Sequence, residues 1–303
     1  LLWPRRRQAL QERSRARPPC LNLTKESDPL RTRRALNSQD PFSVLRGFLV
    51  VKALILAAGE GTRLRPLTLS KPKPMLPVAG RPLLAHIIEW LRGHAITRLA
   101  INLHYKPETI RDYFGDGSRF GVDITYSHED RILGTAGAAR RLQWFLSDGT
   151  FVVVYGDVLT NLDLTALVQF HREHTAVDGV RRALTMALYR VPDPTQAGVV
   201  ELDNVQGGRV LRFLEKPRPE QAFSDLANAG ILVVEPVVLE AIPADTFYDF
   251  GHDLFPVLLA AQVPLYGWPI PEDTYLIDIG SPEKYQRVQK EWPAILRQSG
   301  AGV

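Results

Sequence analysis

Apolar and polar residues follow two alternating patterns from residue 51 onward. Short continuous apolar runs, typical of strands buried on both faces, occur at 51–56, 96–103 and 151–155. Between them, apolar residues recur at helical spacing, most clearly after Pro82. This repetition predicts an α/β fold with a mainly parallel central sheet, whose ligands bind beyond the carboxyl ends of the strands.

The same patterns define the remaining expected elements. The expected helices cover 107–114, 135–146, 164–174, 236–242 and 251–262, followed by a last helix that begins at Pro282 after a Ser281 N-cap. The expected strands cover 122–126, 183–191, 198–202, 209–215, 229–234, 265–269 and 275–279. Because the strands follow one another closely after residue 182, we expect a smaller mixed or antiparallel extension at the open edge of the sheet.

The first 49 residues lack sustained periodicity and are rich in arginine. Residues 1–50 contain eleven Lys and Arg against four Asp and Glu, whereas the rest of the chain contains 26 against 29. We therefore expect a disordered basic extension at 1–49 and one globular domain at 50–303. The extension is a nucleic-acid or membrane-surface tail, an organelle transit peptide, or a segment without function. We hypothesise that the natural start lies near Val50, since the first methionine is Met75.

Composition narrows the classes of function. No apolar run approaches the ~20 residues that a membrane span needs, so we expect no membrane partner. The single cysteine, Cys20, can form neither an internal disulfide nor a cysteine metal cluster, which suits the cytoplasm. The histidines lack the spacing of a zinc site, and we expect His171 and His174 on a solvated helix face. The net negative charge after residue 50 gives no reason to expect a nucleic-acid partner.

The loop after the first strand carries the clearest chemical signal. Residues 56–77 combine two glycines, two arginines and two lysines with too many prolines for one helix. Gly59 and Gly61 allow backbone amides to approach a ligand, and Arg63 and Lys73 offer positive charge to phosphate oxygens. These residue types predict a phosphate-binding loop and leave a basic surface loop as the alternative.

Motifs along 51–303 resemble those of the sugar-1-phosphate nucleotidyltransferases, also called nucleoside-diphosphate-sugar pyrophosphorylases. The family's signature loop matches 56–68 and Lys71-Pro72-Lys73-Pro74. Five further motifs follow in family order, at 133–137, 156–157, 213–217, 228–230 and 277–280. The resemblance implies a three-layer Rossmann-like nucleotidyltransferase fold, with the mixed extension binding the sugar.

The resemblance also implies a reaction and a set of site residues. A nucleotidyl group would pass from a nucleoside triphosphate to a hexose 1-phosphate, and pyrophosphate would be released. The implied catalytic residues are Arg63, Lys73, Asp157 and Lys216, and the implied Mg²⁺ ligands are Asp157 and Asp278. The implied nucleotide-binding residues are Leu56, Ala57, Ala58, Gly59, Gly61, Thr62, Gly134 and Thr135. The implied sugar-phosphate-binding residues are Gly198, Glu215, Lys216 and Asn228.

Ordinary structural roles compete with some of these assignments. Each strand-end aspartate could instead form a turn or cap a helix, and Thr135 could be a helix N-cap. For Asp249 and Asp253, which flank Gly251, we prefer a helix-capping role.

The substrates are less well specified by the sequence than the reaction. Segment 133–137 resembles the GTP-using, mannose-1-phosphate branch, so the first hypothesis is a mannose-1-phosphate guanylyltransferase that makes GDP-mannose for polysaccharide synthesis. A glucose-1-phosphate uridylyl- or thymidylyltransferase is the alternative, because Tyr155 and Leu276 stand where relatives often have asparagine and tryptophan. A non-catalytic NDP-sugar-binding regulatory subunit is the alternative of another class. A homo-oligomer is compatible with all three.

Overall fold

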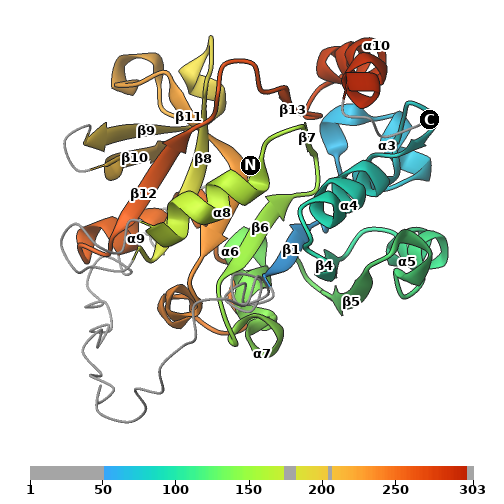
Figure 1. Ribbon diagram of the computed structural model, residues 1–303, viewed down its shortest axis with the longest axis horizontal. Coiled ribbons are helices and arrows are strands. Elements are labelled where there is room, and N and C mark those ends of the chain that lie inside the picture. Colours follow the sequence, from blue (N-terminus) through green and yellow to red (C-terminus); the bar gives the residue numbers. More distant parts are fainter. Residues whose placement is uncertain (1–50, 174–181, 204–206, 299–303) are drawn as a thin grey trace, which may run out of the picture. The chain divides into compact units, whose positions relative to one another are not determined.

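A computed structural model describes residues 51–173, 182–203 and 207–298 (Figure 1). The chain divides into two units, Leu1–Asp40 and Pro41–Val303, and every described residue belongs to the second. The basic extension expected at 1–49 and the domain boundary at residue 50 lie outside the described residues and stay predictions, as does the placement of His174.

A nine-stranded sheet runs through the second unit (Figure 1). Its strands, in spatial order, are β5 (Asp123–His128), β4 (Arg98–Leu103), β1 (Lys52–Leu56), β6 (Phe151–Tyr155), β11 (Leu226–Val234), β8 (Leu184–Arg190), β12 (Leu265–Pro269), β10 (Arg209–Glu215) and β9 (Gly198–Asp203). The first four strands are parallel, and β11 is antiparallel to both β6 and β8. The α/β fold is therefore confirmed, and the mixed extension joins the parallel half through the β6–β11 pair.

Helices form a layer on each face of the sheet. The helices that share one core cluster with the sheet are α4 (Leu83–Gly93), α5 (Pro107–Phe114), α8 (Leu164–Glu173) and α10 (Pro282–Gln298). Ala53 and Ile55 of β1 belong to this cluster, whereas Leu54 between them is buried outside it, because successive strand residues face opposite sides. The buried residues of α6 (Gly134–Arg141) and α7 (Gln143–Leu146) also lie outside it and form the other layer. No helix among the described residues is both long and apolar enough to cross a membrane.

Short elements complete the described part of the chain. The remaining short strands are β2 (Pro77–Val78), β3 (Arg81–Pro82), β7 (Val158–Thr160) and β13 (Leu276–Asp278). The remaining short helices are η1 (Thr62–Leu64), α3 (Leu67–Ser70), η2 (Lys73–Met75), η3 (Ser118–Phe120), η4 (Pro194–Gln196), η5 (Pro219–Gln221), η6 (Pro236–Ala241), η7 (Phe250–Leu254) and α9 (Phe255–Ala260). Strand β7 was not expected, because three residues are too few to show a period.

Some expectations were wrong in detail. The helix expected at 135–146 divides into α6 and α7 at Leu142. The helix expected at 236–242 is the 3-10 helix η6, since Pro243 disfavours α-helical geometry in the residue before it. The helix expected at 251–262 divides into the π-helix η7 and α9, because Pro256 has no amide to donate and fits only a first turn. His171 is not solvated: it is 3% exposed, and its Nδ1 bonds the Thr185 hydroxyl at 2.8 Å.

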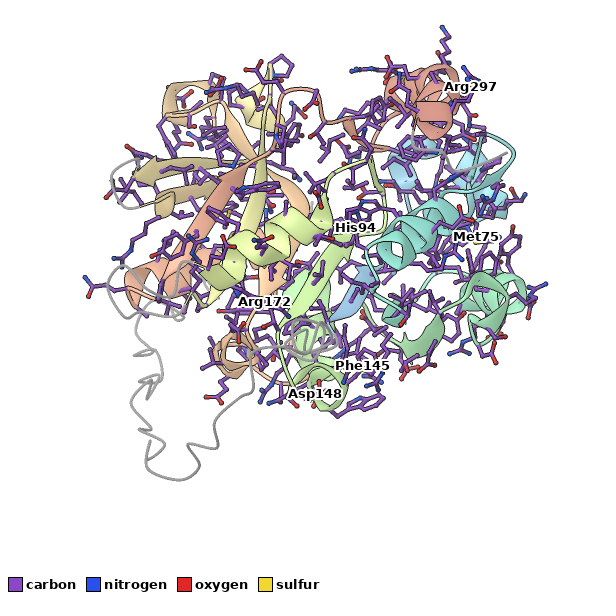
Figure 2. All side chains as sticks on the ribbon, in the orientation of Figure 1. Met75, His94, Phe145, Asp148, Arg172 and Arg297 are labelled. Atoms are coloured by element: carbon purple, nitrogen blue, oxygen red, sulfur yellow. The ribbon has the colours of Figure 1, made fainter. Side chains whose placement is uncertain are left out.

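A buried lysine fixes the amino end of β1. Lys52 is 6% exposed, and its Nζ donates to the carbonyl of Phe145 at 2.7 Å and to Asp148 Oδ2 at 2.6 Å. Phe145 and Asp148 are labelled next to each other in the lower half of Figure 2. These bonds satisfy a charge that would be costly to bury alone. In the pairing of β1 with β6, Lys52 lies opposite Phe151, and the register places Leu56 opposite Tyr155 at the carboxyl end.

Candidate active site

The loop after β1 folds back on the segment that follows it. Gly61 has a φ of 65°, and a Cβ at this position would lie 3.0 Å from both Lys73 Cβ and Thr68 Cγ2. The Thr68 hydroxyl donates to the Gly61 carbonyl at 2.9 Å. Position 61 therefore favours glycine, because its φ is positive and because a side chain would crowd Lys73 and Thr68. Since glycine has no side chain, Lys73 can pack against the loop.

The side chains of Lys73 and Asp157 form an ion pair, although the two residues are 84 positions apart in the sequence. Lys73 Nζ lies 2.5 Å from Asp157 Oδ2, and the side chains are 12% and 28% exposed. Gly156 makes this approach possible: its amide donates to the Leu56 carbonyl at 2.9 Å, and a Cβ would lie 2.6 Å from that oxygen. The carboxyl ends of β1 and β6 are thus in contact, as expected for a binding edge.

Asp278 is positioned near Asp157 by the short strand pair β7–β13. β13 is antiparallel to β7, with Asp278 opposite Val158, and the Ile279 amide donates to the Asp157 carbonyl at 2.8 Å. Burial raises the pKa of Tyr189 to about 12, and the negative charges of Asp278 and Asp157 act in the same direction. Both carboxylates therefore border one site.

Arg63 borders that site as well. A Cβ on Gly280 would lie 2.5 Å from Asp278 Oδ1 and 3.3 Å from Arg63 Nη2. The Asp278 carboxylate also binds the ammonium of Lys284, the third residue of α10. Four residues named from the sequence, Arg63, Lys73, Asp157 and Asp278, are consequently brought together at one edge of the sheet.

Asp157 and Asp278, each paired with the ammonium of a lysine, could bind a divalent cation. The described residues contain no group of three His, Cys, Asp or Glu that could hold a metal. Mg²⁺ commonly takes one or two carboxylates and completes its shell with waters and substrate oxygens, so Asp157 and Asp278 suffice. The lysine that each carboxylate binds shows that the site already requires positive charge.

The predicted sugar-binding residues gather around Glu215. Glu215 ends β10 opposite Gly198 of β9, and a Cβ on Gly198 would lie 2.6 Å from Glu215 Oε2. A Cβ on Gly251 would lie 2.4 Å from the same oxygen. Burial raises the pKa of Glu215, while the positive charges of Lys216 and His252 oppose that change. The carboxylate thus occupies a slot that exists because two neighbours lack side chains.

Lys216 stands at the margin of this slot, and Asn228 follows Ala227, which pairs with Val199 beside Gly198. Lys216 has a φ of 45°, and its Nζ lies 3.8 Å from Glu215 Oε1. Asn228 Oδ1 accepts from the Gly230 amide at 3.1 Å, within an irregularity in the pairing of β11 with β8. Gly230 has a φ of 73°, and a Cβ there would lie 3.0 Å from the ring of Tyr155. The ring of Tyr155 thus adjoins the bend beside Asn228.

Thr135 links the nucleotide segment to the region around Glu215 and does not cap a helix. Helix α6 begins at Gly134 with Leu133 as its N-cap, so the capping role considered for Thr135 was wrong. Its hydroxyl donates to Asp249 Oδ2 at 2.9 Å and accepts from the Phe250 amide at 2.9 Å. Asp249 does cap η7, as predicted, by accepting from the Gly251 amide at 2.9 Å.

A buried bridge near the loop was missed by sequence reasoning. Asn102 Oδ1 accepts from the Ala57 amide at 2.7 Å, and its Nδ2 donates to Glu129 Oε1 at 2.9 Å. Glu129 Oε2 accepts from the Leu133 amide at 2.9 Å. Both side chains are at most 3% exposed. Asn102 lies near the end of β4 and Glu129 directly after β5, and polar residues at two parallel carboxyl ends were the available signal.

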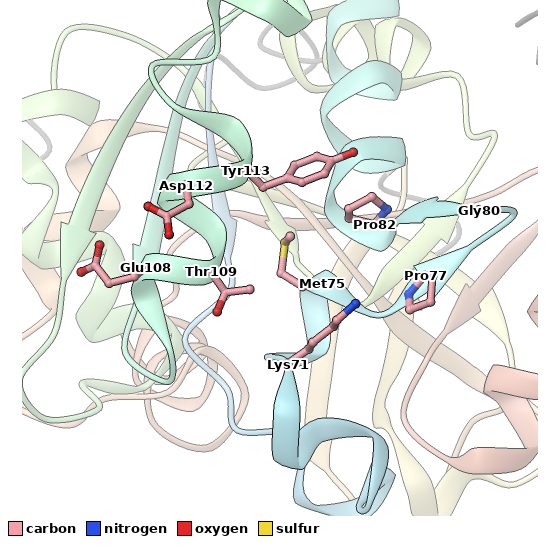
Figure 3. A pocket seen from close by; sticks show the side chains of 9 residues that line it. All are labelled: Lys71, Met75, Pro77, Gly80, Pro82, Glu108, Thr109, Asp112 and Tyr113. Carbon is pink, nitrogen blue, oxygen red and sulfur yellow. The ribbon is translucent and has the colours of Figure 1, made fainter.

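A separate cavity lies elsewhere. It encloses about 680 Å³, and Figure 3 shows Lys71 and Met75 on one side of it and Asp112 and Tyr113 of α5 on the other. None of the site residues predicted from the sequence lines it. We therefore place the candidate active site at the cluster of charged side chains and not at this cavity.

Comparisons with known proteins identify relatives of the chain. A model of the nucleotidyl transferase family matches residues 52–294. The UTP–glucose-1-phosphate uridylyltransferase of Synechocystis is 40% identical over 253 residues, which cover 79% of this chain and 63% of that protein. The mannose-1-phosphate guanylyltransferase of Mycobacterium tuberculosis is 40% identical over 238 residues, covering 78% of this chain and 63% of that protein. The chain thus spans 63% of the length of these two relatives.

Solved structures share the fold. A putative glucose-1-phosphate thymidylyltransferase from Bacillus anthracis superposes with a TM-score of 0.67 at 24% identity, and the match covers 79% of this chain and 94% of that one. The Rossmann-like nucleotidyltransferase fold implied by the motifs is therefore confirmed.

Proposed function

The chain belongs to the nucleotidyl transferase family, and on this basis we propose that it transfers a nucleotidyl group from a nucleoside triphosphate to a hexose 1-phosphate. The observation that carries the proposal is the convergence of Arg63, Lys73, Asp157 and Asp278 at the carboxyl ends of β1, β6 and β13. Such a cluster suits phosphoryl chemistry, which depends on positioning and on neutralising charge.

The proposed reaction needs no protein nucleophile. An oxygen of the sugar phosphate attacks the α-phosphorus and forms a new P–O bond. The bond from the α-phosphorus to the bridging oxygen breaks, and pyrophosphate leaves with the electron pair. The protein has to hold two anions in line and offset their repulsion, which is strong at low dielectric.

The charged residues divide these tasks. Arg63, exposed beside the loop, holds the departing phosphates, and the amides of the loop between Ala57 and Thr62 surround the triphosphate. Lys73 holds the α-phosphate, and Lys216 holds the phosphate of the sugar. A divalent cation, which we propose to be Mg²⁺, would be held by Asp157 and Asp278 and would supply positive charge against the triphosphate.

The sugar half of the proposed site recognises hydroxyl groups. The carboxylate of Glu215 can accept from two hydroxyls, and the Asn228 amide can both donate and accept. The missing side chains at Gly198 and Gly251 leave the space that the Glu215 carboxylate needs.

Mannose 1-phosphate and GTP are the substrates that we propose first. Segment 133–137 supports them, as does the relative from Mycobacterium tuberculosis, named a mannose-1-phosphate guanylyltransferase. Glucose 1-phosphate and UTP are the second candidate pair, because the relative from Synechocystis is equally similar at 40% identity. A cytoplasmic location and a homo-oligomeric state stay predictions.

A substrate matrix tests the proposal. Pyrophosphate release is measured for GTP, UTP, dTTP, CTP and ATP, each with mannose 1-phosphate and glucose 1-phosphate. We expect the fastest release from GTP with mannose 1-phosphate. Turnover with UTP and none with GTP would replace the first pair by the second. Binding of NDP-sugars without turnover of any pair would favour the regulatory subunit.

A further inference from the structure

Each of the two aspartates in the site is bound by one lysine. Lys73 Nζ lies 2.5 Å from Asp157 Oδ2, and Lys284 Nζ donates to Asp278 Oδ2. The proposed function gives Lys73 a phosphate to hold. It gives no role to Lys284.

The position of Lys284 in its helix is electrostatically unfavourable. Lys284 lies in the first turn of α10, and its amide faces the Ser281 hydroxyl at 3.3 Å. Unpaired amides make the start of a helix partly positive, so acidic residues such as Glu283 are preferred there and lysine is disfavoured. The Asp278 carboxylate offsets this cost, because it lies within reach of the ammonium.

Asp278 binds one ammonium and lies in the neighbourhood of Arg63. The Oδ2 atom accepts from Lys284, and the Oδ1 atom faces Gly280, beside which Arg63 Nη2 lies. The side chains of Lys284 and Asp278 are 45% and 32% exposed, so the ammonium can move into solvent without uncovering buried surface. A cation that approaches the Oδ2 atom has to displace this ammonium.

Resting on the proposed function, we propose that Lys284 is an internal counter-ion of Asp278 that competes with the divalent cation for the Oδ2 atom. Without the cation, Lys73 and Lys284 neutralise two carboxylates that border one site. When the cation binds, the ammonium loses its partner and repels the cation at short range. Lys284 therefore weakens cation binding to the free protein.

Mn²⁺ binding, followed by electron paramagnetic resonance on the chain without nucleotide, tests this competition. We expect Lys284→Gln to bind Mn²⁺ about three- to tenfold more tightly than the unchanged protein. Lys284→Arg keeps the charge and should stay within about twofold of the unchanged protein. Lys290→Gln removes a charge from an exposed position on the same helix and should also leave the affinity unchanged. Far-UV circular dichroism checks that each variant is folded.

An Asp278→Asn variant separates failure of this inference from failure of the proposed function. If Mn²⁺ binding falls in Asp278→Asn but is equal or weaker in Lys284→Gln, Lys284 is not a competitor and the metal assignment stands. If Asp278→Asn binds Mn²⁺ as the unchanged protein does, both the inference and the metal assignment are wrong. Absence of Mn²⁺ binding to all these proteins contradicts both in the same way.

Discussion

Two buried residues, Asn102 and Glu129, anchor the start of the loop after β1. Asn102 holds the Ala57 amide, and Glu129 accepts from Asn102 and from the Leu133 amide, one bond to each carboxylate oxygen. The bridge therefore joins the two segments that we propose to bind the nucleotide. A glutamine at position 129 has one acceptor oxygen and would point its NH₂ group at a second donor.

We predict that Glu129→Gln impairs nucleotide binding more than folding. The unmatched donor should lower the free energy of unfolding by about 1–3 kcal/mol and raise the KM for the nucleoside triphosphate about tenfold. Steady-state kinetics and urea unfolding measure the two effects. The matched control is Asp130→Asn, whose side chain is 94% exposed and should change neither quantity. An unchanged KM in Glu129→Gln would show that the bridge does not position the loop.

At the scale of elements, the turn from β1 into η1 depends on Gly61 and not on Gly59. Gly61 has a φ of 65° and lies against Lys73 and Thr68, whereas a Cβ on Gly59 would meet nothing within 4 Å. We predict that Gly61→Ala lowers the free energy of unfolding by about 1–3 kcal/mol, because alanine is strained at positive φ and must push its neighbours aside. Gly59→Ala should cost less than about 0.5 kcal/mol. Equal losses in urea unfolding of the two variants would contradict this account of the turn.

Helix α10 is attached through a histidine that must be neutral. The His86 Nε2 atom bonds the Val78 carbonyl at 2.8 Å, so it carries the proton, and Nδ1 accepts from Trp292 Nε1 at 3.2 Å. A second proton on the ring would sit on Nδ1 and point at the N–H group of Trp292, which also donates. Burial lowers the pKa of His86 below its ordinary 6.5, with the Arg81 charge acting in the same direction.

The lowered pKa of His86 predicts loss of stability in acid. The stabilisation that neutral His86 contributes is complete above pH 6.5, the ordinary pKa of histidine. It is lost as the pH falls toward the pKa of His86 in the folded protein. Urea unfolding between about pH 7.5 and pH 5 should show the free energy of unfolding decreasing more in the unchanged protein than in His86→Gln, which does not titrate. Identical pH profiles would mean that His86 does not control the attachment of α10.

The sequence predicts those elements and contacts that depend on local pattern. The apolar run of β6 and the spacing of α5 gave their bounds without error, at Phe151–Tyr155 and Pro107–Phe114. Strand β7 was missed because its three residues pair with β13, more than a hundred residues away. The Asn102–Glu129 bridge and the Lys284–Asp278 pair were missed because no periodicity of the sequence relates the two residues of either pair.

At the scale of the whole molecule, the fold places two groups of residues at the carboxyl ends of strands. The parallel half brings Lys73 to Asp157, and the mixed extension presents Glu215 between Gly198 and Gly251. The Thr135–Asp249 bond connects these halves. This division supports a site for two substrates, with the triphosphate at the parallel half and the sugar at the extension.

We propose that this edge of the sheet performs nucleotidyl transfer with Asp157 at its centre. The most direct measurement follows NDP-sugar and pyrophosphate by ³¹P nuclear magnetic resonance, using the best substrate pair from the matrix. We predict equal amounts of both products from the unchanged protein and a rate at least about a hundredfold lower in Asp157→Asn. Asp123→Asn, at an exposed position of β5, should keep the full rate. Full activity in a folded Asp157→Asn protein, or no product from the unchanged protein with any pair, would contradict the account.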